Sequence, residues 1–306
     1  MPEGVEVTWA TYYLNKKFSG MYLKKMIVHQ GRYTRNDIVG SEFVKKKLKL
    51  CRVYSKGKLL IWEWRQSKKK DKYYMLNTLG LTGRWSYNSG NVEFIFCKDR
   101  KNSKETISIY FDDIRNFGTI KFINSEEIES VDNLRNKDLV KESFDYKYIK
   151  DIFENNKTIA KKPIVKVLME QGSLGIGSGI GNYLVAEILY KAKISPHRIT
   201  KTLTLREIKK LTKSIKYIIK LSYLKGQVGY FDNLDKKILK TIQRTRKKII
   251  NGKLPELDYH PEIKISEKSQ FYFKAYRQSE DPKGNEVVGS KIIKGRTTYW
   301  VPAIQK

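Results

Sequence analysis

The sequence predicts an α+β fold, with an antiparallel β-sandwich in its N-terminal part and a helical C-terminal part. Short runs of alternating character between residues 22 and 124 are typical of antiparallel strands. From about residue 147 to 250, apolar residues recur at helical spacing instead. With 306 residues, 40% of them hydrophobic, the chain is long enough to build two separate cores.

The first element predicted is a helix over residues 3–17, which Gly20 would stop. Its apolar positions recur near a 3.6-residue period, at Val5, Trp9, Tyr12, Tyr13 and Phe18. Six strand-like runs follow, separated by turn residues: MYLKKMIVH, LKLCRVYSKGKLLIWEW, YYMLNTLG, VEFIFCK, ISIYFDDI and TIKFIN. Together they predict an N-terminal sandwich domain over residues 1–125.

The acidic, aperiodic residues 126–146 are interpreted as a linker. Residues 147–260 predict a helical domain, which contains PIVKVLMEQ, GNYLVAEILYKAKI and LREIKKLTKSIKYIIKLSYLK. Residues 261–306 predict a closing hairpin built from FYFKAYRQ and GRTTYWVPAIQ. No internal repeat or low-complexity segment is found in the sequence.

The composition points to a polyanionic partner. Lys and Arg number 62 against 32 Asp and Glu, a formal net charge of +30 spread over the whole chain. A solvated lysine-rich surface is the ordinary alternative. No apolar run approaches the roughly 20 residues that span a bilayer, and the N-terminus lacks the pattern of a signal peptide. We therefore expect an intracellular protein that does not associate with membranes.

The chain contains two cysteines, Cys51 and Cys97, and each lies in a strand-like run. Two thiols do not make a disulfide framework or a four-cysteine zinc site, so both are interpreted as small core residues. No metal site and no cofactor are expected.

Pro2 is a candidate nucleophile, because removal of Met1 would leave its secondary amine at the N-terminus. An α-amino group titrates near about 8, well below lysine, so more of it is uncharged at neutral pH. Such an amine attacks a sugar C1′ to give an iminium ion, which acidifies the C2′ protons. Glu3 and Glu6 lie close enough in the sequence to move protons or support the amine. Proline followed by glutamate is also ordinary helix-start chemistry, and alone it favours that interpretation.

Five segments in order favour the catalytic interpretation of Pro2 over an ordinary helix start: PEGVEV, SKGKLLIW, LGLTG, DIRNFGT and GSGIGNYLVAEILY. Together they resemble the formamidopyrimidine-DNA glycosylase and endonuclease VIII family over essentially the whole chain. The resemblance implies Pro2 as nucleophile, Glu3 as acid and Glu6 as the second glutamate, although Val5 replaces the family's usual proline. Lys58 matches the lysine that contacts phosphate near the lesion and assists catalysis, with Lys56 as its neighbouring competitor.

The resemblance further implies that Leu81, Arg115 and Phe117 fill the gap left by the flipped-out nucleotide. Without the family pattern, Leu81 and Phe117 are better interpreted as core residues at strand ends. GSGIGNYLVAEILY matches the helix–two-turn–helix of the family, in which Asn182 opens the second helix at an anion-favouring N-terminus. Glu187 makes this match more specific.

The last forty residues depart from most bacterial relatives, which end in a four-cysteine zinc finger. Here Tyr276–Arg277 is followed by DPKGNE, and Val301 and Ile304 stand where the second cysteine pair would be. This resembles the zincless finger of vertebrate and large-virus endonuclease VIII-like enzymes. We expect packing of Tyr299, Trp300 and Val301 to replace the metal, and Arg296 at the hairpin tip to hold a phosphate.

The resemblance therefore implies a monomeric, bifunctional glycosylase and abasic-site lyase acting on damaged double-stranded or single-stranded DNA. Oxidised pyrimidines such as thymine glycol and 5-hydroxyuracil are the expected bases, with ring-opened purines beside them. An 8-oxoguanine enzyme, an inactive damaged-DNA-binding protein and a basic RNA-associated protein are the alternatives. The segment KGQVGYFDNLDKK, expected to decide the base, does not distinguish them by sequence.

Overall fold

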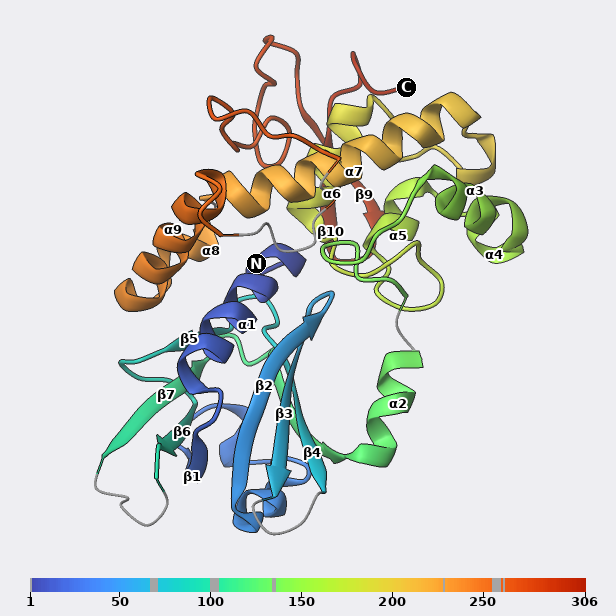
Figure 1. Ribbon diagram of the computed structural model, residues 1–306. Coiled ribbons are helices and arrows are strands. Elements are labelled where there is room, and N and C mark those ends of the chain that lie inside the picture. The colour runs from blue at the N-terminus through green and yellow to red at the C-terminus, as the bar shows by residue number, and fades with distance from the viewer. Residues whose placement is uncertain are drawn as a thin grey trace. The chain divides into compact units, whose positions relative to one another are not determined.

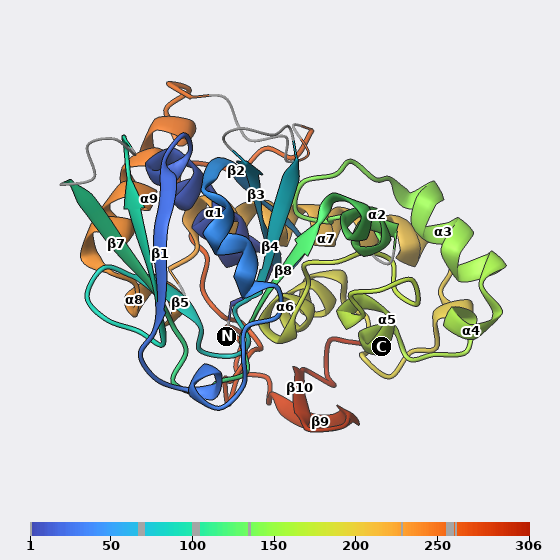
Figure 2. The ribbon, with the colours of Figure 1, turned by 90° about the horizontal axis from the view of Figure 1, so that it is seen from below.

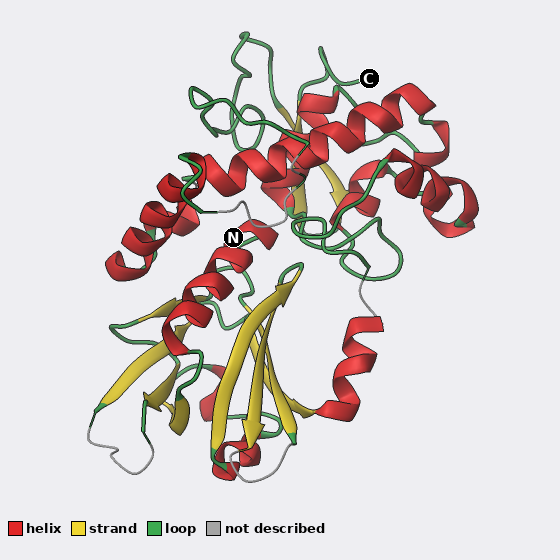
Figure 3. Ribbon diagram, in the orientation of Figure 1, coloured by secondary structure: helices red, strands yellow, loops and turns green. Residues whose placement is uncertain are grey.

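The computed structural model describes residues 2–66, 71–99, 105–133, 136–227, 229–254, 260 and 262–306. These residues form two compact units that are not simple halves of the chain. Unit 1 comprises 1–2, 6–134 and 228–247, and unit 2 comprises 3–5, 135–227 and 248–306. Strands dominate unit 1, whereas unit 2 is mainly helical with one small hairpin (Figure 3).

The α+β class is confirmed, and the strands of unit 1 follow the sequence runs closely. Within the described part of unit 1 they make an eight-stranded antiparallel sheet in the order β5-β7-β6-β1-β2-β3-β4-β8 (Figure 1). The strands are β1 (Tyr22–Val28), β2 (Leu48–Lys56), β3 (Leu59–Gln66), β4 (Lys72–Thr78), β5 (Arg84–Ser86), β6 (Val92–Cys97), β7 (Thr106–Asp112) and β8 (Thr119–Asn124).

The sheet bends between β1 and β2, where a single residue pair, Tyr22 and Lys49, joins two four-stranded layers into the sandwich. Alternating positions fill the space between the layers with large rings. Trp62 and Trp64 stack 5.9 Å apart, and Trp62 also packs on Phe94 at 6.3 Å. Cys97 is buried and Cys51 half-buried in this sheet. The predicted N-terminal helix is α1 (Gly4–Phe18), whose residues from Glu6 onward belong to unit 1.

Residues 126–146, interpreted as a linker, include a helix that the aperiodic sequence did not indicate, α2 (Ser125–Asn133). Asn124 accepts from the N–H groups of Glu126 and Glu127, while Glu127 accepts from the N–H of Asn124. This reciprocal capping starts the helix in an acidic segment. Ile128 then anchors it in an apolar cluster on the outer face of β3, β4 and β8.

Unit 2 contains the helices predicted from residue 147 onward. They are α3 (Tyr146–Asn155), α4 (Lys157–Ala160), α5 (Ile164–Met169), α6 (Asn182–Ala192) and α7 (Leu205–Lys225). A capping box between Thr204 and Glu207 starts α7, and the apolar faces of α6 and α7 pack together as its core. No helix in the described ranges is long and apolar enough to cross a membrane.

Two further helices, α8 (Gly229–Asp232) and α9 (Lys236–Ile250), follow α7 in the sequence. By contacts, residues 228–247 group with unit 1, although the sequence assigned them to the helical domain. In both ribbon views α9 lies beside α1 (Figures 1 and 2). The guanidinium of Arg246 stands 5.3 Å from the Trp9 ring and 4.5 Å from Phe231. The functional domain boundaries expected from the sequence stay a prediction.

The closing hairpin is confirmed, but FYFKAYRQ is not one of its strands. It consists of β9 (Val288–Ile293) and β10 (Arg296–Trp300). The N–H groups of Lys274, Ala275 and Tyr276 donate to Glu187 Oε1 at 2.9–3.0 Å instead of to a strand. A buried carboxylate on α6 therefore holds this aromatic segment in an irregular path.

Candidate active site

Pro2 is buried and immediately precedes α1, and Glu3 beside it has 0% of its surface exposed. The Glu3 carboxylate accepts from the N–H groups of Gly181 at 2.7 Å, Tyr183 at 2.8 Å and Leu184 at 3.3 Å. The anion at the N-terminus of α6 in this structure is therefore Glu3, where the sequence suggested a phosphate.

Glycines allow the N-terminal segment to approach the GSGIG run closely. The N–H of Gly4 donates to the carbonyl of Gly179 at 2.8 Å. A Cβ built on Gly4 would come within 2.7 Å of the Gly179 Cα, so a side chain there would push the two segments apart. The GSGIG run of the helix–two-turn–helix thus receives the N-terminal segment of the chain.

Glu6 is also buried and belongs to unit 1. The nearby side chain that the sequence did not reveal is Tyr230 on α8. Burial raises the pKa of Tyr230, and the charge of Glu6 adds to the effect. The Tyr230 hydroxyl is buried with no hydrogen-bond partner among the described residues. Part of KGQVGYFDNLDKK therefore lies near Glu6, which no local pattern could indicate.

Lys58 lies in the two-residue turn between β2 and β3, and its side chain is half-buried. Lys56, its competitor, ends β2 and pairs with Leu59 across the hairpin. The turn places Lys58 at the tip, as the sequence predicted, whereas Lys56 remains in the ladder.

The three gap-filling candidates come from two loops that are tied together. Leu81 is half-buried in the turn after β4, and Arg115 and Phe117 are exposed in the loop between β7 and β8. Thr82 joins the loops, because its hydroxyl donates to Asp113 and accepts from the N–H of Arg115 at 3.2 Å.

Phe117 is 55% exposed, so its interpretation as a core residue is wrong. The Arg115 guanidinium stands 5.2 Å from the centroid of its ring, which forms a cation–π pair at the surface. The structure thus presents an exposed planar pair beside a half-buried leucine on one side of unit 1.

Within unit 2, Asn182 and the hairpin are in contact. The Asn182 side-chain amide donates to the carbonyl of Thr297 at 3.1 Å, next to Arg296. Arg296 begins β10 with an exposed side chain, directly after the turn residue Gly295. The two predicted phosphate contacts therefore come from connected elements.

The finger is held by packing, as expected, and also by a polar centre that the sequence did not reveal. Val301 is fully buried, and the Tyr299 ring packs on Tyr276 at 5.5 Å. In the preceding turn, Asp281 accepts from the backbone N–H groups of Lys283 and Asn285 and from the Asn285 amide.

Tyr190 on α6 donates its hydroxyl to the other oxygen of Asp281 at 3.0 Å. Desolvation opposes ionisation of Asp281, but these hydrogen bonds outweigh it and hold its pKa at about 2. Within the part of the chain that the structure describes, no group of three or more His, Cys, Asp or Glu residues is arranged to bind a metal ion.

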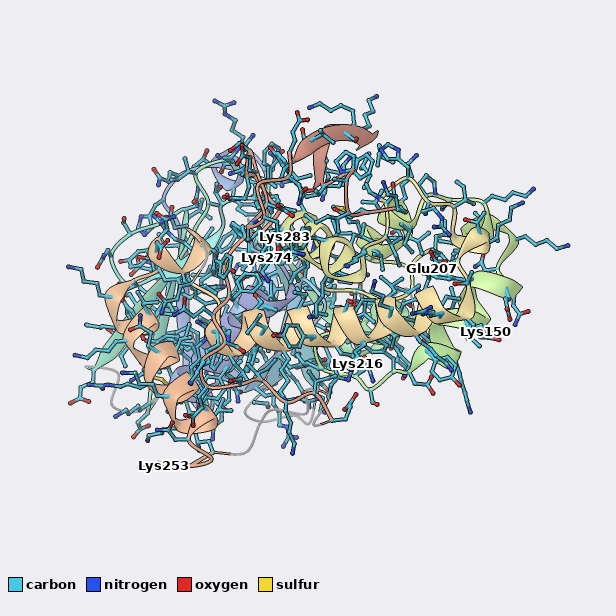
Figure 4. All side chains as sticks on the ribbon, turned by 90° about the horizontal axis from the view of Figure 1, so that it is seen from above. Lys150, Glu207, Lys216, Lys253, Lys274 and Lys283 are labelled. Atoms are coloured by element: carbon cyan, nitrogen blue, oxygen red, sulfur yellow. The ribbon has the colours of Figure 1, made fainter. Side chains whose placement is uncertain are left out.

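Positive charge is spread over several elements of unit 2 rather than gathered at one point. The labelled lysines include Lys150 on α3, Lys216 on α7 and Lys253 after α9 (Figure 4). Net charge alone therefore does not locate a binding face.

Three family models match consecutive parts of the chain. The N-terminal domain of formamidopyrimidine-DNA glycosylase matches residues 1–120, its H2TH domain 137–231 and its C-terminal domain 261–306. The formamidopyrimidine-DNA glycosylase of Ureaplasma parvum is 28% identical over 240 residues, which cover 72% of this chain and 78% of the relative.

The enzyme of the same name from a Wolbachia species of Drosophila simulans is 31% identical over 208 residues, covering 58% of this chain and 70% of the relative. Among solved structures, the Lactococcus lactis enzyme bound non-covalently to DNA with an abasic site superposes with a TM-score of 0.69. It is 20% identical and covers 99% of each chain, a likeness in fold.

Proposed function

The chain belongs to the formamidopyrimidine-DNA glycosylase family of DNA glycosylases and abasic-site lyases of base excision repair, and on this premise we propose that Pro2 is its nucleophile. The observation that carries the proposal is the placement of Pro2, buried at the start of α1 beside the fixed carboxylate of Glu3. Burial and the positive end of the helix dipole both favour the uncharged amine that attacks carbon.

In the proposed reaction the Pro2 nitrogen bonds to C1′ while the bond from C1′ to the damaged base breaks. Glu3 takes the proton from the nitrogen and passes it to O4′ as the sugar ring opens, which leaves an iminium ion. Loss of a C2′ proton then expels the 3′ phosphate, and loss of the C4′ proton expels the 5′ phosphate. Water finally releases the sugar fragment from Pro2.

We assign Glu6 to support of the amine, and Lys58, Asn182 and Arg296 to phosphates around the lesion. Lys58 stands at the tip of a turn. The Asn182 side chain contacts the protein backbone at Thr297, beside Arg296, so Asn182 and Arg296 are suited to binding phosphates together. Leu81, Arg115 and Phe117 would take the space of the extruded nucleotide. The exposed Arg115–Phe117 pair offers the planar surface that this role needs.

For the substrate we propose oxidised pyrimidines such as thymine glycol and 5-hydroxyuracil, together with ring-opened purines. The support is the cysteine-free finger, which resembles the zincless finger of endonuclease VIII-like enzymes. The second candidate is 8-oxoguanine, favoured by a similar structure of MutM with DNA containing carbocyclic 8-oxoguanine. We further propose that the protein acts as a monomer on damaged DNA inside the cell.

The test is borohydride trapping on a duplex with an abasic site. The protein is made with a protease-removable N-terminal extension, and each preparation is assayed before and after removal. We expect a covalent adduct on the Pro2 peptide only after removal, because an extended chain has no Pro2 amine. Trapping of both forms, or an adduct on a lysine, would contradict the assignment. Binding without any adduct would favour the inactive DNA-binding alternative.

Base preference is measured separately, as single-turnover cleavage of duplexes carrying thymine glycol or 8-oxoguanine opposite cytosine. Faster removal of thymine glycol supports the proposal. The reverse order favours the second candidate and leaves the role of Pro2 untouched.

A further inference from the structure

The strongest feature outside the proposed site is the outer face of α9. Over Lys236–Ile250 the helix contains no acidic residue. Six exposed cations follow one another along it: Lys236, Lys237, Lys240, Arg244, Lys247 and Lys248. None of the six makes an ion pair with a described residue. Asp235, the carboxylate closest in sequence, accepts from the backbone N–H of Lys237 at the start of the helix.

A hollow of about 470 Å³ lies beside this face, within unit 1. Its rim is basic and its floor is aromatic. The rim is formed by Lys17, Lys237, Lys240 and Arg244, and the remaining lining by Tyr13, Phe18, Tyr87, Ile107 and Thr241.

The floor is a built structure rather than loose surface. The Tyr13 hydroxyl donates to that of Tyr87 at 2.8 Å, and the Phe18 ring stacks on Tyr87 with an interplanar angle of 28°. The Lys237 ammonium stands 5.5 Å from the centre of the Tyr87 ring. The floor thus holds one half-buried ring under a cation.

This hollow lies at the far end of α1 from Pro2. Tyr13, Lys17 and Phe18 occupy the last turns of a helix of 15 residues, whereas Pro2 precedes its first turn. At about 1.5 Å per residue the two ends are about 21 Å apart. A DNA strand covers that distance in about six nucleotides at roughly 3.4 Å each.

We propose that the basic face of α9 and the adjoining hollow form a second DNA-contacting surface, which holds the DNA backbone outside the lesion site. The rim cations bind phosphates, and the Tyr87 ring packs against a sugar. Lysines and arginines without carboxylate partners are suited to phosphates, and aromatic rings between them are typical of nucleic-acid surfaces. A membrane surface fits less well, since Ile107, 39% exposed, is the only large exposed hydrophobic residue of the hollow among those described.

The test combines Lys237→Gln, Lys240→Gln and Arg244→Gln in the full-length protein. Glutamine keeps helix propensity, and all three side chains are exposed, so the fold should be unchanged. The matched control, Lys24→Gln with Lys25→Gln and Lys45→Gln, removes the same charge from exposed positions elsewhere in unit 1. Melting temperatures of both triple variants are compared with that of the unchanged protein.

Binding is measured by fluorescence anisotropy on two duplexes with a central abasic analogue. One extends about four base pairs to each side and the other about fifteen, so only the longer spans the distance along α1. For the longer duplex we expect the α9 variant to bind about tenfold more weakly at physiological salt. The slope of log affinity against log salt should fall by about 2 to 3, because three phosphate contacts are lost. On the shorter duplex the two variants should bind alike.

Cleavage at saturating enzyme in a single turnover should be unchanged, as should borohydride trapping, which separates this proposal from the role of Pro2. Equal losses for the α9 variant and the control, or equal losses on both duplexes, would overturn the proposal. Weaker binding to heparin with unchanged binding to DNA would assign the face to another polyanion and would overturn it as well.

Discussion

Asp281 organises the turn of the finger by accepting five hydrogen bonds through its two oxygens, from backbone, amide and phenol donors. Here a buried carboxylate brings the turn and α6 together without a metal ligand. The arrangement depends on the charged form of the side chain, because every donor supplies a hydrogen to it.

The stability of the finger should therefore depend on pH within the acidic range in which Asp281 titrates. The pKa of Asp281 is about 2 in the folded protein, below its usual 3.8. A depressed carboxyl pKa gives stability that is present above the unfolded value and is lost as the pH falls through the folded one. We expect Asp281→Asn to be less stable at neutral pH, and its difference from the unchanged protein to shrink between about pH 4 and pH 2.

The measurement is urea unfolding of both proteins at steps of pH. Glu286→Gln is the control, since it removes an exposed carboxylate one residue beyond Asn285. A difference for Asp281→Asn that stays constant with pH would show that the charge of this residue does not stabilise the turn.

Pro2, Glu3 and Lys58 lie in short motifs, and they were selected because five such motifs in order resemble a known family. Taken alone, Pro2 followed by Glu3 favours an ordinary helix start, and Lys58 is one solvated lysine among many. Glu187 and Asp281 act on partners about ninety positions away, and no local spacing reports such contacts. Nor could a sequence indicate that the anion at the N-terminus of α6 is the carboxylate of Glu3.

The hairpin positions Arg296 through one backbone conformation. Gly295 has φ 73°, in the left-handed region, and no atom lies within 4 Å of a Cβ built there. A substitution at this position is thus limited by backbone strain alone. A β-branched residue in the left-handed region costs about 1–2 kcal/mol, whereas asparagine tolerates it.

We therefore expect Gly295→Val to change the turn and to weaken binding of a duplex with an abasic analogue, while Gly295→Asn keeps the affinity. Dissociation constants and melting temperatures of the two variants provide the comparison. If Gly295→Val binds as tightly as Gly295→Asn, the turn does not position Arg296 for DNA.

Seven of the eight described strands of unit 1 were predictable, because alternation over six to nine residues is a local signal, whereas the three-residue β5 was not predicted. The helix α2 was missed because four of its nine residues are acidic and no apolar period stands out, although Asn124 and Glu127 carry the spacing of a capping box. FYFKAYRQ has the composition of a strand, yet its N–H groups bind Glu187. Tertiary contacts there override local preference.

Unit 1 is assembled from segments that are far apart in the sequence. The polypeptide leaves it after Leu134 and returns with α8 and α9 at residues 228–247. This return brings Phe231, Ile238 and Ile242 into buried positions, each at most 3% exposed. Such a side chain contributes about 1.5–3 kcal/mol when fully buried. Three of them approach the total stability of a typical domain, about 5–15 kcal/mol.

The chain should for this reason not yield an independent N-terminal domain by simple truncation. We expect a fragment of residues 1–134 to unfold without a cooperative transition and to bind a hydrophobic dye, because it lacks α9 over Trp9. The same fragment joined to residues 226–252 through a glycine–serine linker should recover a cooperative thermal transition and lose the dye signal. Circular dichroism and dye fluorescence of the two proteins measure this. Cooperative unfolding of the shorter fragment at the same temperature would mean that α8 and α9 only cover a sandwich already stable by itself, and that the boundary near residue 125 predicted from the sequence is the folding boundary.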